Sequence, residues 1–549
     1  MAVSERDQVR KRLWVDLNSK KTWSETIPVY KSEGIGGRYL NARLFSERFS
    51  LKCFTSPPEF PIALSVGPLA GTFAPCSGWT SISSFTPLME PPEYAHVSLP
   101  GHWGPHLKFA GFDQCVILGK SPLPVYLHIE KGMVTFEDAR MIWGKSTVDT
   151  VRTIQEDKED RELEILCIGP AGEKGSLVAN VINRTSWTAD HTALGSVFGG
   201  KNLKALVLGR GKPVSFREPK KFLDLCLDLR SHLSRDKTVI RLKEKGTFYF
   251  LGKNWGGLGI RNFREISSEA YDALWESLFS LNYAYGQESC FSCPIHCGRV
   301  ARLDGDCFGG IHLEGAWSLG PQIGLLDWKE TLTLYRDCLL QGIDPSSAGS
   351  ILSGVMDASE KGNQTVEELR WGDAQEARRL IRKLIPGDMR WNLLPGEILH
   401  TADERGRDRV LQGKTHWMGL PVRDPRSSPE YAMTLTLFPL EWDYLRSFLP
   451  ESFRRLDASS GERTDSHAVE EAMKWRQLKV LADMTSMCPL VVADLGLLSV
   501  DAISDMTGAL LGVVCDPSVF IEGARKTMQM EEALRRQVKD RECLKGSPF

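Results

Sequence analysis

The sequence changes character near residue 210, and this change limits the folds that the chain can adopt. Before it, short β-branched runs such as 61–66 and 125–129 are separated by turn-forming pairs such as Gly67-Pro68. After it, segments such as 220–234 and 326–341 carry apolar residues at intervals of three and four, which is typical of amphipathic helices. We therefore expect an α+β protein in which strands come first and helices follow.

The chain of 549 residues is long enough for several domains with cores of their own. We expect a β-rich domain at 1–210 and two mainly helical domains at 211–415 and 416–549. Within the first domain, the pattern also predicts helices at 148–155 and 175–183.

Charge and hydropathy exclude some classes of protein. The formal net charge is −2, which gives no basic surface of the kind that binds nucleic acid. The N-terminus is polar and lacks the apolar core of a signal peptide, and no run reaches the ~20 apolar residues that span a bilayer. The most apolar stretch, 506–515, is interpreted as a buried helix. We expect a cytoplasmic protein without a membrane span, whose thiols are reduced.

Three of the thirteen cysteines form the pattern Cys290-x2-Cys293-x3-Cys297. This spacing brings three thiolates to one side of a tight loop, as a [4Fe–4S] cluster requires. A zinc ion is the alternative, with His296 as a further ligand. The spacing leaves the fourth ligand open among the other ten cysteines. Cys488 differs from most of these, because it lies near Asp483 at a predicted helix end.

Two other features carry chemistry in the sequence. Glycine-rich turns at 34–38, 67–72 and 168–173 allow a backbone to approach a flat cofactor or an anion closely, although each is also an ordinary turn. Glu314 follows the cysteine loop and precedes an apolar segment. It is either a proton-transfer group near a buried centre or a helix-start carboxylate favoured by the helix dipole.

Several motifs follow one another along the chain, at 67–72, 107–113, 119–126, 168–173 and 200–205, in the loop that ends at Cys297-Gly-Arg-Val300, and at Asp424-Pro-Arg426. Taken in this order, they resemble the aldehyde:ferredoxin oxidoreductase family over nearly the whole chain.

The resemblance implies a tungsten or molybdenum centre held by two pyranopterins, with a [4Fe–4S] cluster close by. The β-rich domain is the base for the pterins, and the two helical domains carry the cluster ligands. By this matching Cys290, Cys293, Cys297 and Cys488 bind the cluster. Asp483 and Asp344 each contact one pterin, and Glu314 acts at the metal.

Six positions depart from the family's pattern. Trp79 and His191 stand where the family has arginines, and arginine would pair strongly with pterin phosphates. The remaining four are Ser98 for an asparagine, Leu339 for an aspartate, Ser486 for a glycine and Tyr444 for the histidine that partners the glutamate. We retain Ser98 and His191 as cofactor-binding candidates, and Tyr444 as a catalytic hydrogen-bond donor.

The predicted function is oxidation of an aldehyde-type substrate to the acid, with electrons passing through the cluster to ferredoxin or another iron–sulfur subunit. The partners are then a small-molecule substrate and further subunits, in a homodimer or hetero-oligomer. One alternative is a pterin-altered paralogue that serves as an electron-transfer or scaffold subunit. Another is a reductase of an activated acid or aromatic thioester.

Overall fold

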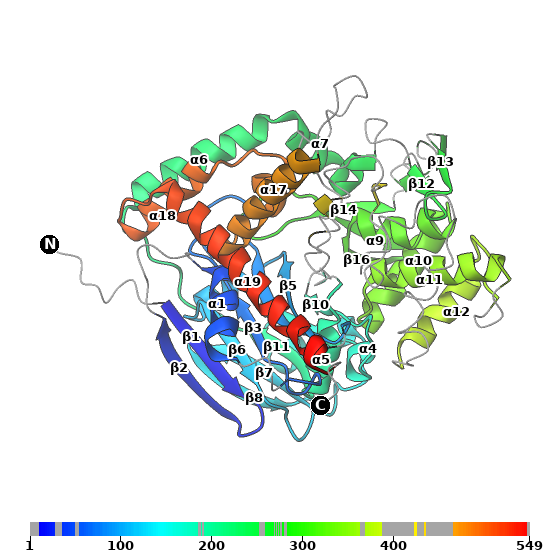
Figure 1. Cartoon of the computed structure of the whole chain (residues 1–549), viewed down its shortest axis with the longest axis horizontal. Coiled ribbons are helices and arrows are strands. Elements are labelled where there is room, and N and C mark those ends of the chain that lie inside the picture. The colour runs from blue at the N-terminus through cyan, green and yellow to red at the C-terminus, as the bar shows by residue number, and fades with distance from the viewer. Residues whose placement is uncertain are drawn as a thin grey trace.

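The first strands form a six-stranded mixed sheet in the computed structural model (Figure 1). Its strands are β1 (Arg10–Asp16), β2 (Lys21–Ile27), β3 (Ile62–Ser65), β4 (Thr80–Thr86), β5 (Glu93–Leu99) and β6 (Gln114–Leu118), in the order β2-β1-β6-β3-β4-β5. Only the β1–β6 pair is parallel. The structure describes residues 10–27, 36–49, 54–89, 91–184, 188, 191–251, 258–267, 269–270, 272, 274, 277–278, 283–362, 368–386, 422–424, 433–434, 437 and 465–545.

A second sheet repeats this arrangement with five strands. They are β7 (Val125–Glu130), β8 (Met133–Asp138), β9 (Glu164–Ile168), β10 (Val181–Asn183) and β11 (Leu203–Leu208), in the order β10-β9-β11-β7-β8. In the first sheet, β1 of the β1–β2 hairpin pairs in parallel with the last strand, β6, which pairs antiparallel with β3, and a Gly-Pro turn follows β3. In the second sheet, β7 of the β7–β8 hairpin pairs in parallel with the last strand, β11, which pairs antiparallel with β9, and a Gly-Pro turn follows β9. The two halves therefore share one topology.

Short helices complete the β-rich part of the chain. They are α1 (Gly37–Arg48), α2 (Trp103–Phe109), α3 (Thr147–Asp157), α4 (Pro170–Glu173) and α5 (Leu194–Gly200). The helix expected at 148–155 is confirmed by α3. The helix expected at 175–183 is wrong, because Val181–Asn183 pairs with β9 and Asn180 N donates to Gly342 O at 2.8 Å. Pairing with distant strands and loops decided the conformation of this short apolar run.

Helices dominate the described residues after 210, with two small sheets between them. The elements are α6 (Pro219–Arg235), α7 (Lys237–Lys245), η3 (Gly246–Leu251), β12 (Leu258–Ile260), β13 (Glu265–Ser267), β14 (Ala284–Glu288), β15 (Gly298–Leu303), β16 (Asp306–Ile311), α9 (Leu313–Ser318), η5 (Pro321–Ile323), α10 (Trp328–Gln341), α11 (Pro345–Glu360), α12 (Ala374–Leu384), α17 (Asp465–Thr485), η7 (Leu490–Asp494), α18 (Val500–Leu511) and α19 (Pro517–Lys545). The α+β prediction is confirmed. The helices expected at 220–234 and 326–341 correspond to α6 and α10.

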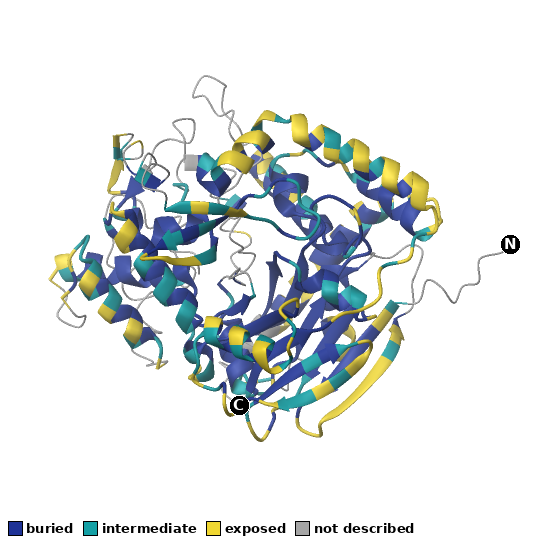
Figure 2. Ribbon diagram, turned by 180° about the vertical axis from the view of Figure 1, so that it is seen from behind, coloured by how far each residue is buried: buried dark blue, intermediate teal, exposed yellow. Residues whose placement is uncertain are grey.

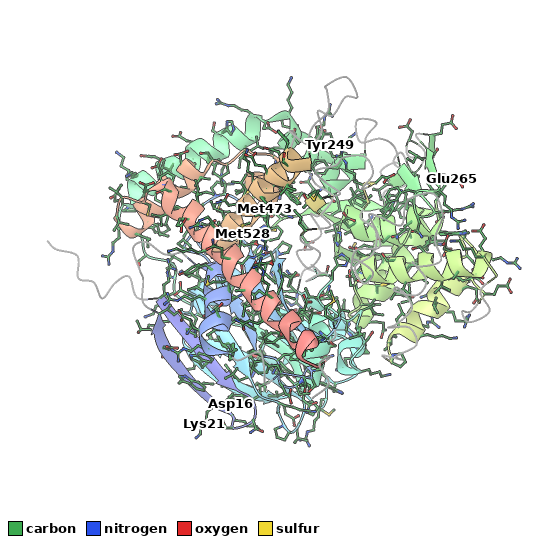
Figure 3. The ribbon with its side chains drawn as sticks, in the orientation of Figure 1. Asp16, Lys21, Tyr249, Glu265, Met473 and Met528 are labelled. Carbon is green, nitrogen blue, oxygen red and sulfur yellow. The ribbon has the colours of Figure 1, made fainter. Side chains whose placement is uncertain are left out.

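The C-terminal helices return to the first sheet. In Figure 1 the long helix α19 crosses in front of the sheet, where it packs against α1 and α17. Met473 of α17 and Met528 of α19 lie near this crossing in Figure 3, whereas Asp16 and Lys21 lie at the outer end of the β1–β2 hairpin. The end of α17 is thereby held against the first half of the chain.

Burial follows this arrangement. Figure 2 shows buried residues concentrated in the sheets and in the helices that cover them, with exposed residues on the outer faces of α6 and β2. No helix in the described part of the chain combines the length and the apolar character needed to cross a lipid bilayer.

Candidate metal centre

The cysteine loop connects two antiparallel strands, β14 and β15, which fix its two ends. Within it, Cys293 N donates to Cys290 O at 3.1 Å, so the chain turns tightly between the first two thiols. Cys290 and Cys297 are buried and Cys293 is partly buried. The predicted tight turn is present, and it carries three thiols into the interior.

Cys488 lies beside this loop, although it is far from Cys297 in the sequence. The helix α17 ends at Thr485, and Ser486 takes a left-handed conformation (φ 63°) that redirects the chain. Burial raises the pKa of the Cys488 thiol well above its usual range, and the nearby Cys293 and Cys297 raise it further. The structure thus brings Cys488 to the loop cysteines, as the resemblance implies.

A fifth cysteine, Cys76, joins this group, which the sequence did not predict. Its Sγ lies 3.7 Å from Cys293 Sγ, and its carbonyl accepts the N–H of Cys488 at 2.9 Å. In the sequence it is one of the ten cysteines among which spacing leaves the fourth ligand open. The available signal was its setting in Ala74-Pro75-Cys76-Ser77-Gly78, which is typical of a turn rather than of an apolar core strand.

The donors that come together here are thiols. Among the described residues, no three His, Cys, Asp or Glu side chains come close enough together to hold one metal ion. A structural zinc needs four ligands at 2.0–2.3 Å from one centre, whereas the thiolates of a [4Fe–4S] cluster each bind a different iron. Thiols are the ligands that an iron–sulfur cluster takes, and zinc stays the alternative left open by the sequence.

The first Gly-Pro turn packs directly on the segment that leads to Cys488. Gly67 N donates to Ser486 Oγ at 2.8 Å, and a Cβ added to Gly67 would lie 2.3 Å from the carbonyl carbon of Thr485. Only a glycine allows this approach. Because the turn follows β3, the first sheet sets the position of both Asp483 and Cys488.

Asp483 is buried in a network of charged and polar groups. It accepts hydrogen bonds from Ser98 Oγ and from Arg38 Nη1 (3.1 Å), and His96 Nε2 lies 3.3 Å away. Ser98 and His96 share a face of β5 because they are two residues apart. Arg38 also donates to both carboxylate oxygens of Glu531 on α19, at 2.8 Å each. Although burial favours the neutral acid, His96, Arg38 and Ser98 keep the pKa of Asp483 below its usual range.

The second Gly-Pro turn packs on the segment that leads to Asp344. A Cβ added to Gly169 would lie 2.4 Å from the carbonyl carbon of Gln341, and Gly342 follows in a left-handed conformation (φ 70°). Asp344 N then donates to Val178 O at 2.9 Å. This is the counterpart, in the second sheet, of the contact between Gly67 and the end of α17.

Asp344 caps helix α11 and pairs with His191. Its carboxylate accepts from Ser346 N (3.1 Å), from Ser347 N (3.2 Å) and from Ser347 Oγ, and His191 Nδ1 lies 3.1 Å away. Burial opposes the charge, but His191, Ser347 and Ser346 keep the pKa of Asp344 well below its usual range. Two pairs of predicted residues, Ser98 with Asp483 and His191 with Asp344, are thus in contact.

Three of the departures from the family's pattern are buried in these same regions. Trp79 is fully buried, and its backbone N–H donates to Ser486 O at 3.3 Å. Ser486 adopts the left-handed conformation that a glycine would otherwise supply. Leu339 is buried at the end of α10, where its carbonyl accepts from Thr147 Oγ1 at 2.7 Å.

Glu314 lies in the first turn of α9 and is completely buried. Its Oε2 accepts a hydrogen bond from Val422 N at 3.1 Å. Both interpretations of this residue remain compatible with its place, since it is a helix-start carboxylate and is also withdrawn from solvent. Tyr444 lies outside the described residues.

Comparison with known proteins decides the family. Models described as "Aldehyde ferredoxin oxidoreductase, N-terminal domain" and "domains 2 & 3" match residues 12–210 and 224–541. The chain belongs to the aldehyde ferredoxin oxidoreductase family. The resemblance inferred from the motifs is confirmed, and the chain is an oxidoreductase-type enzyme of this family.

Individual relatives and one solved structure are also similar to this chain. The tungsten-containing aldehyde ferredoxin oxidoreductase of Pyrococcus abyssi is 28% identical, over 91% of this chain and 84% of its own length. The aliphatic sulfonate oxidoreductase, WOR-like subunit, of Pyrococcus furiosus is 24% identical over 64% of this chain and 60% of its own. The fold is similar to that of the active site complex BamBC of benzoyl coenzyme A reductase with 1,5-dienoyl-CoA, with a TM-score of 0.80, 19% identity, and 96% of this chain and 89% of that chain covered.

Proposed function

We propose that this protein is an iron–sulfur oxidoreductase that oxidises an aldehyde-type substrate to the acid and passes the electrons to ferredoxin. In this proposal Cys290, Cys293, Cys297 and Cys488 hold a [4Fe–4S] cluster. The observation that carries the proposal is the convergence of these four thiols from two distant segments, because burying so many sulfurs together has little purpose in packing alone.

The second part of the proposal is a tungsten centre held by two pyranopterins. The tungsten-containing relatives support it, and so do two buried carboxylates placed alike in the two halves. Among the described residues, Asp483 Oδ1 accepts one hydrogen bond, from Ser98, and Asp344 Oδ1 accepts one, from Ser346 N. Each oxygen has a second lone pair that can accept an N–H of a pterin ring.

The residues of this chain have distinct roles in such an enzyme. The tungsten centre supplies the two-electron chemistry when bound. Glu314, withdrawn from solvent, accepts the proton released from the substrate, and Tyr444 donates a hydrogen bond in place of the family's histidine. The base domain would be 1–210, with the cysteine loop in a domain at 211–415 and the fourth thiol in one at 416–549.

A second candidate is favoured by Trp79. Its fully buried indole stands where the family has an arginine for a pterin phosphate, and an indole cannot replace that cation. On this view the chain keeps the cluster, loses or changes the pterin site, and serves as an electron-transfer or scaffold subunit of a larger redox complex. Reduction of an activated acid or aromatic thioester is a further alternative, in keeping with the dienoyl-CoA named for the structural neighbour.

Metal analysis of anaerobically purified protein separates these candidates. The enzyme proposal expects about four irons and about one tungsten per chain, together with aldehyde-dependent reduction of ferredoxin. About four irons without tungsten, molybdenum or pterin would contradict the enzyme proposal and favour the electron-transfer subunit. Metal-loaded protein that reduces an aromatic thioester but does not oxidise aldehydes would favour the reductase.

A further inference from the structure

Cys76 is fastened by its backbone to both segments that carry the proposed cluster ligands. Its N–H donates to Ser292 O at 3.1 Å, within the cysteine loop, and its carbonyl accepts the N–H of Cys488 at 2.9 Å. The residue adopts a left-handed conformation (φ 65°), which is uncommon for a residue with a Cβ and persists only where the surroundings enforce it. These contacts hold Cys76 against both segments.

The side chain of Cys76 points at one proposed ligand. Cys76 Sγ lies 3.7 Å from Cys293 Sγ, within hydrogen-bond distance for sulfur, and Cys76 is fully buried. The same loop presses on the ligand loop at Gly78, where an added Cβ would lie 2.8 Å from Phe291 N and 3.1 Å from Cys290 Cβ.

We propose that Cys76 is a positioning residue that keeps its proton and donates an S–H hydrogen bond to the Cys293 thiolate, which raises the reduction potential of the cluster. This inference rests on the proposed function, in which Cys293 binds iron. A cysteine that binds iron is a thiolate and can only accept a hydrogen bond, so the proton between the two sulfurs belongs to Cys76. Reduction adds negative charge to the cluster and its thiolates, and a hydrogen bond to a ligand sulfur stabilises that charge.

The alternative is that Cys76 is itself an iron ligand. The sequence spacing favours Cys293, because it lies in the tight Cys-x2-Cys-x3-Cys loop with two other proposed ligands. Cys76 lies in the first half of the chain, far before that loop in the sequence, and contacts it through one thiol and one backbone bond. A positioning residue can be removed without loss of iron, whereas a ligand cannot, so a substitution separates the two roles.

The test uses the full-length protein with Cys76→Ala and Cys76→Ser. Iron per chain and the midpoint potential are measured, the latter by electron paramagnetic resonance during a redox titration. We expect Cys76→Ala to bind as much iron as the parent and to have a lower potential. At a fixed solution potential its ratio of reduced to oxidised cluster falls by about tenfold, which corresponds to about 59 mV for one electron. Cys76→Ser keeps a donor and stays close to the parent.

Cys115→Ala is the matched control. Cys115 is also completely buried, but it lies in strand β6 within the first sheet, so its loss should leave the potential unchanged. If Cys76→Ala does not fold, Cys76→Gly replaces it, because glycine suits the left-handed conformation and also lacks the donor.

Two results would overturn the inference. Loss of iron from a folded Cys76→Ala or Cys76→Gly protein would show that Cys76 is a ligand. An unchanged potential in a variant with full iron content would show that the S–H does not act on the cluster. Absence of iron from the parent protein would instead contradict the proposed function itself, and this inference with it.

Discussion

The two sheets that precede position 210 carry the same Gly-Pro turn, yet the segments that pack on these turns differ. The turn at Gly67 meets the end of α17, which continues to Cys488 and the other thiols. The turn at Gly169 meets the end of α10, which continues to Asp344 and helix α11. The two halves therefore share this glycine contact, whereas the thiols lie beside the first half alone.

The two buried aspartates, Asp483 and Asp344, also have different surroundings. Asp483 pairs with the cation Arg38, which is shared with Glu531, so its charge belongs to a network that joins α1, α17 and α19. Asp344 instead caps a helix and contacts His191. The two aspartates therefore differ in their surroundings: Asp483 contacts the guanidinium of Arg38, whereas Asp344 is held by the N-terminus of α11 and by His191.

Substitution of the two aspartates gives the largest expected difference between the halves. Asp483→Ala leaves the buried Arg38 with one carboxylate fewer and should lower the free energy of unfolding by about 3–5 kcal/mol. Asp344→Ala removes a helix cap and should cost about 1–2 kcal/mol. Urea denaturation of both variants measures the two losses of unfolding free energy. Equal losses of unfolding free energy would show that the charge network around Asp483 stabilises the protein no more than the helix cap does.

Substitution of the two glycines should have equal effects on stability and unequal effects on iron. Gly67→Ala and Gly169→Ala each place a methyl group against backbone at 2.3–2.4 Å, and each should cost about 1–3 kcal/mol. Gly67→Ala also displaces the segment that leads to Cys488 and should bind less iron, whereas Gly169→Ala should keep its iron. Iron loss in both variants would contradict a cluster confined to one half.

A pH-dependent effect concerns Lys201, which joins the halves. Its Nζ donates to Pro58 O at 2.9 Å and to Gly119 O at 3.0 Å. Burial lowers the pKa of Lys201 from 10.5 to about 7. Because the folded state favours the neutral amine, this group reduces stability as pH falls from about 10.5 towards 7, and the loss is constant below that range.

Lys201→Met should therefore flatten the dependence of the thermal midpoint on pH between about 7 and 10, with the exposed Lys212→Met as control. Thermal denaturation at several pH values measures it. A slope equal to that of the parent would show that Lys201 is charged in the folded protein and that its hydrogen bonds offset burial.

The parts of the site that were predictable from sequence are those set by short-range spacing. Cys290, Cys293 and Cys297 lie within one short loop, so their proximity needs no knowledge of the fold. Cys488 required the resemblance, because it lies far from that loop in the sequence. Cys76 was missed, since its place depends on how the turn after β3 packs on the end of α17.

In the fold, too, only the features set by local sequence were predictable. The α+β order followed from local periodicity, but the stretch 175–183 became a turn and a strand because β9 and Gly342 supplied its partners. The topology that the two sheets share could not be predicted from the sequence either. The two halves share little sequence beyond the turns at Gly67-Pro68 and Gly169-Pro170, and topology is maintained by hydrogen bonds between backbones.

The measurement that tests the central claim most directly is the electron paramagnetic resonance spectrum of the reduced protein, with iron per chain, in the parent and in Cys488→Ser. The account predicts a [4Fe–4S] signal and about four irons in the parent. It also predicts loss of that signal in Cys488→Ser and an unaltered signal in the control Cys115→Ala. An unchanged signal in Cys488→Ser would contradict the claim that this thiol completes the cluster.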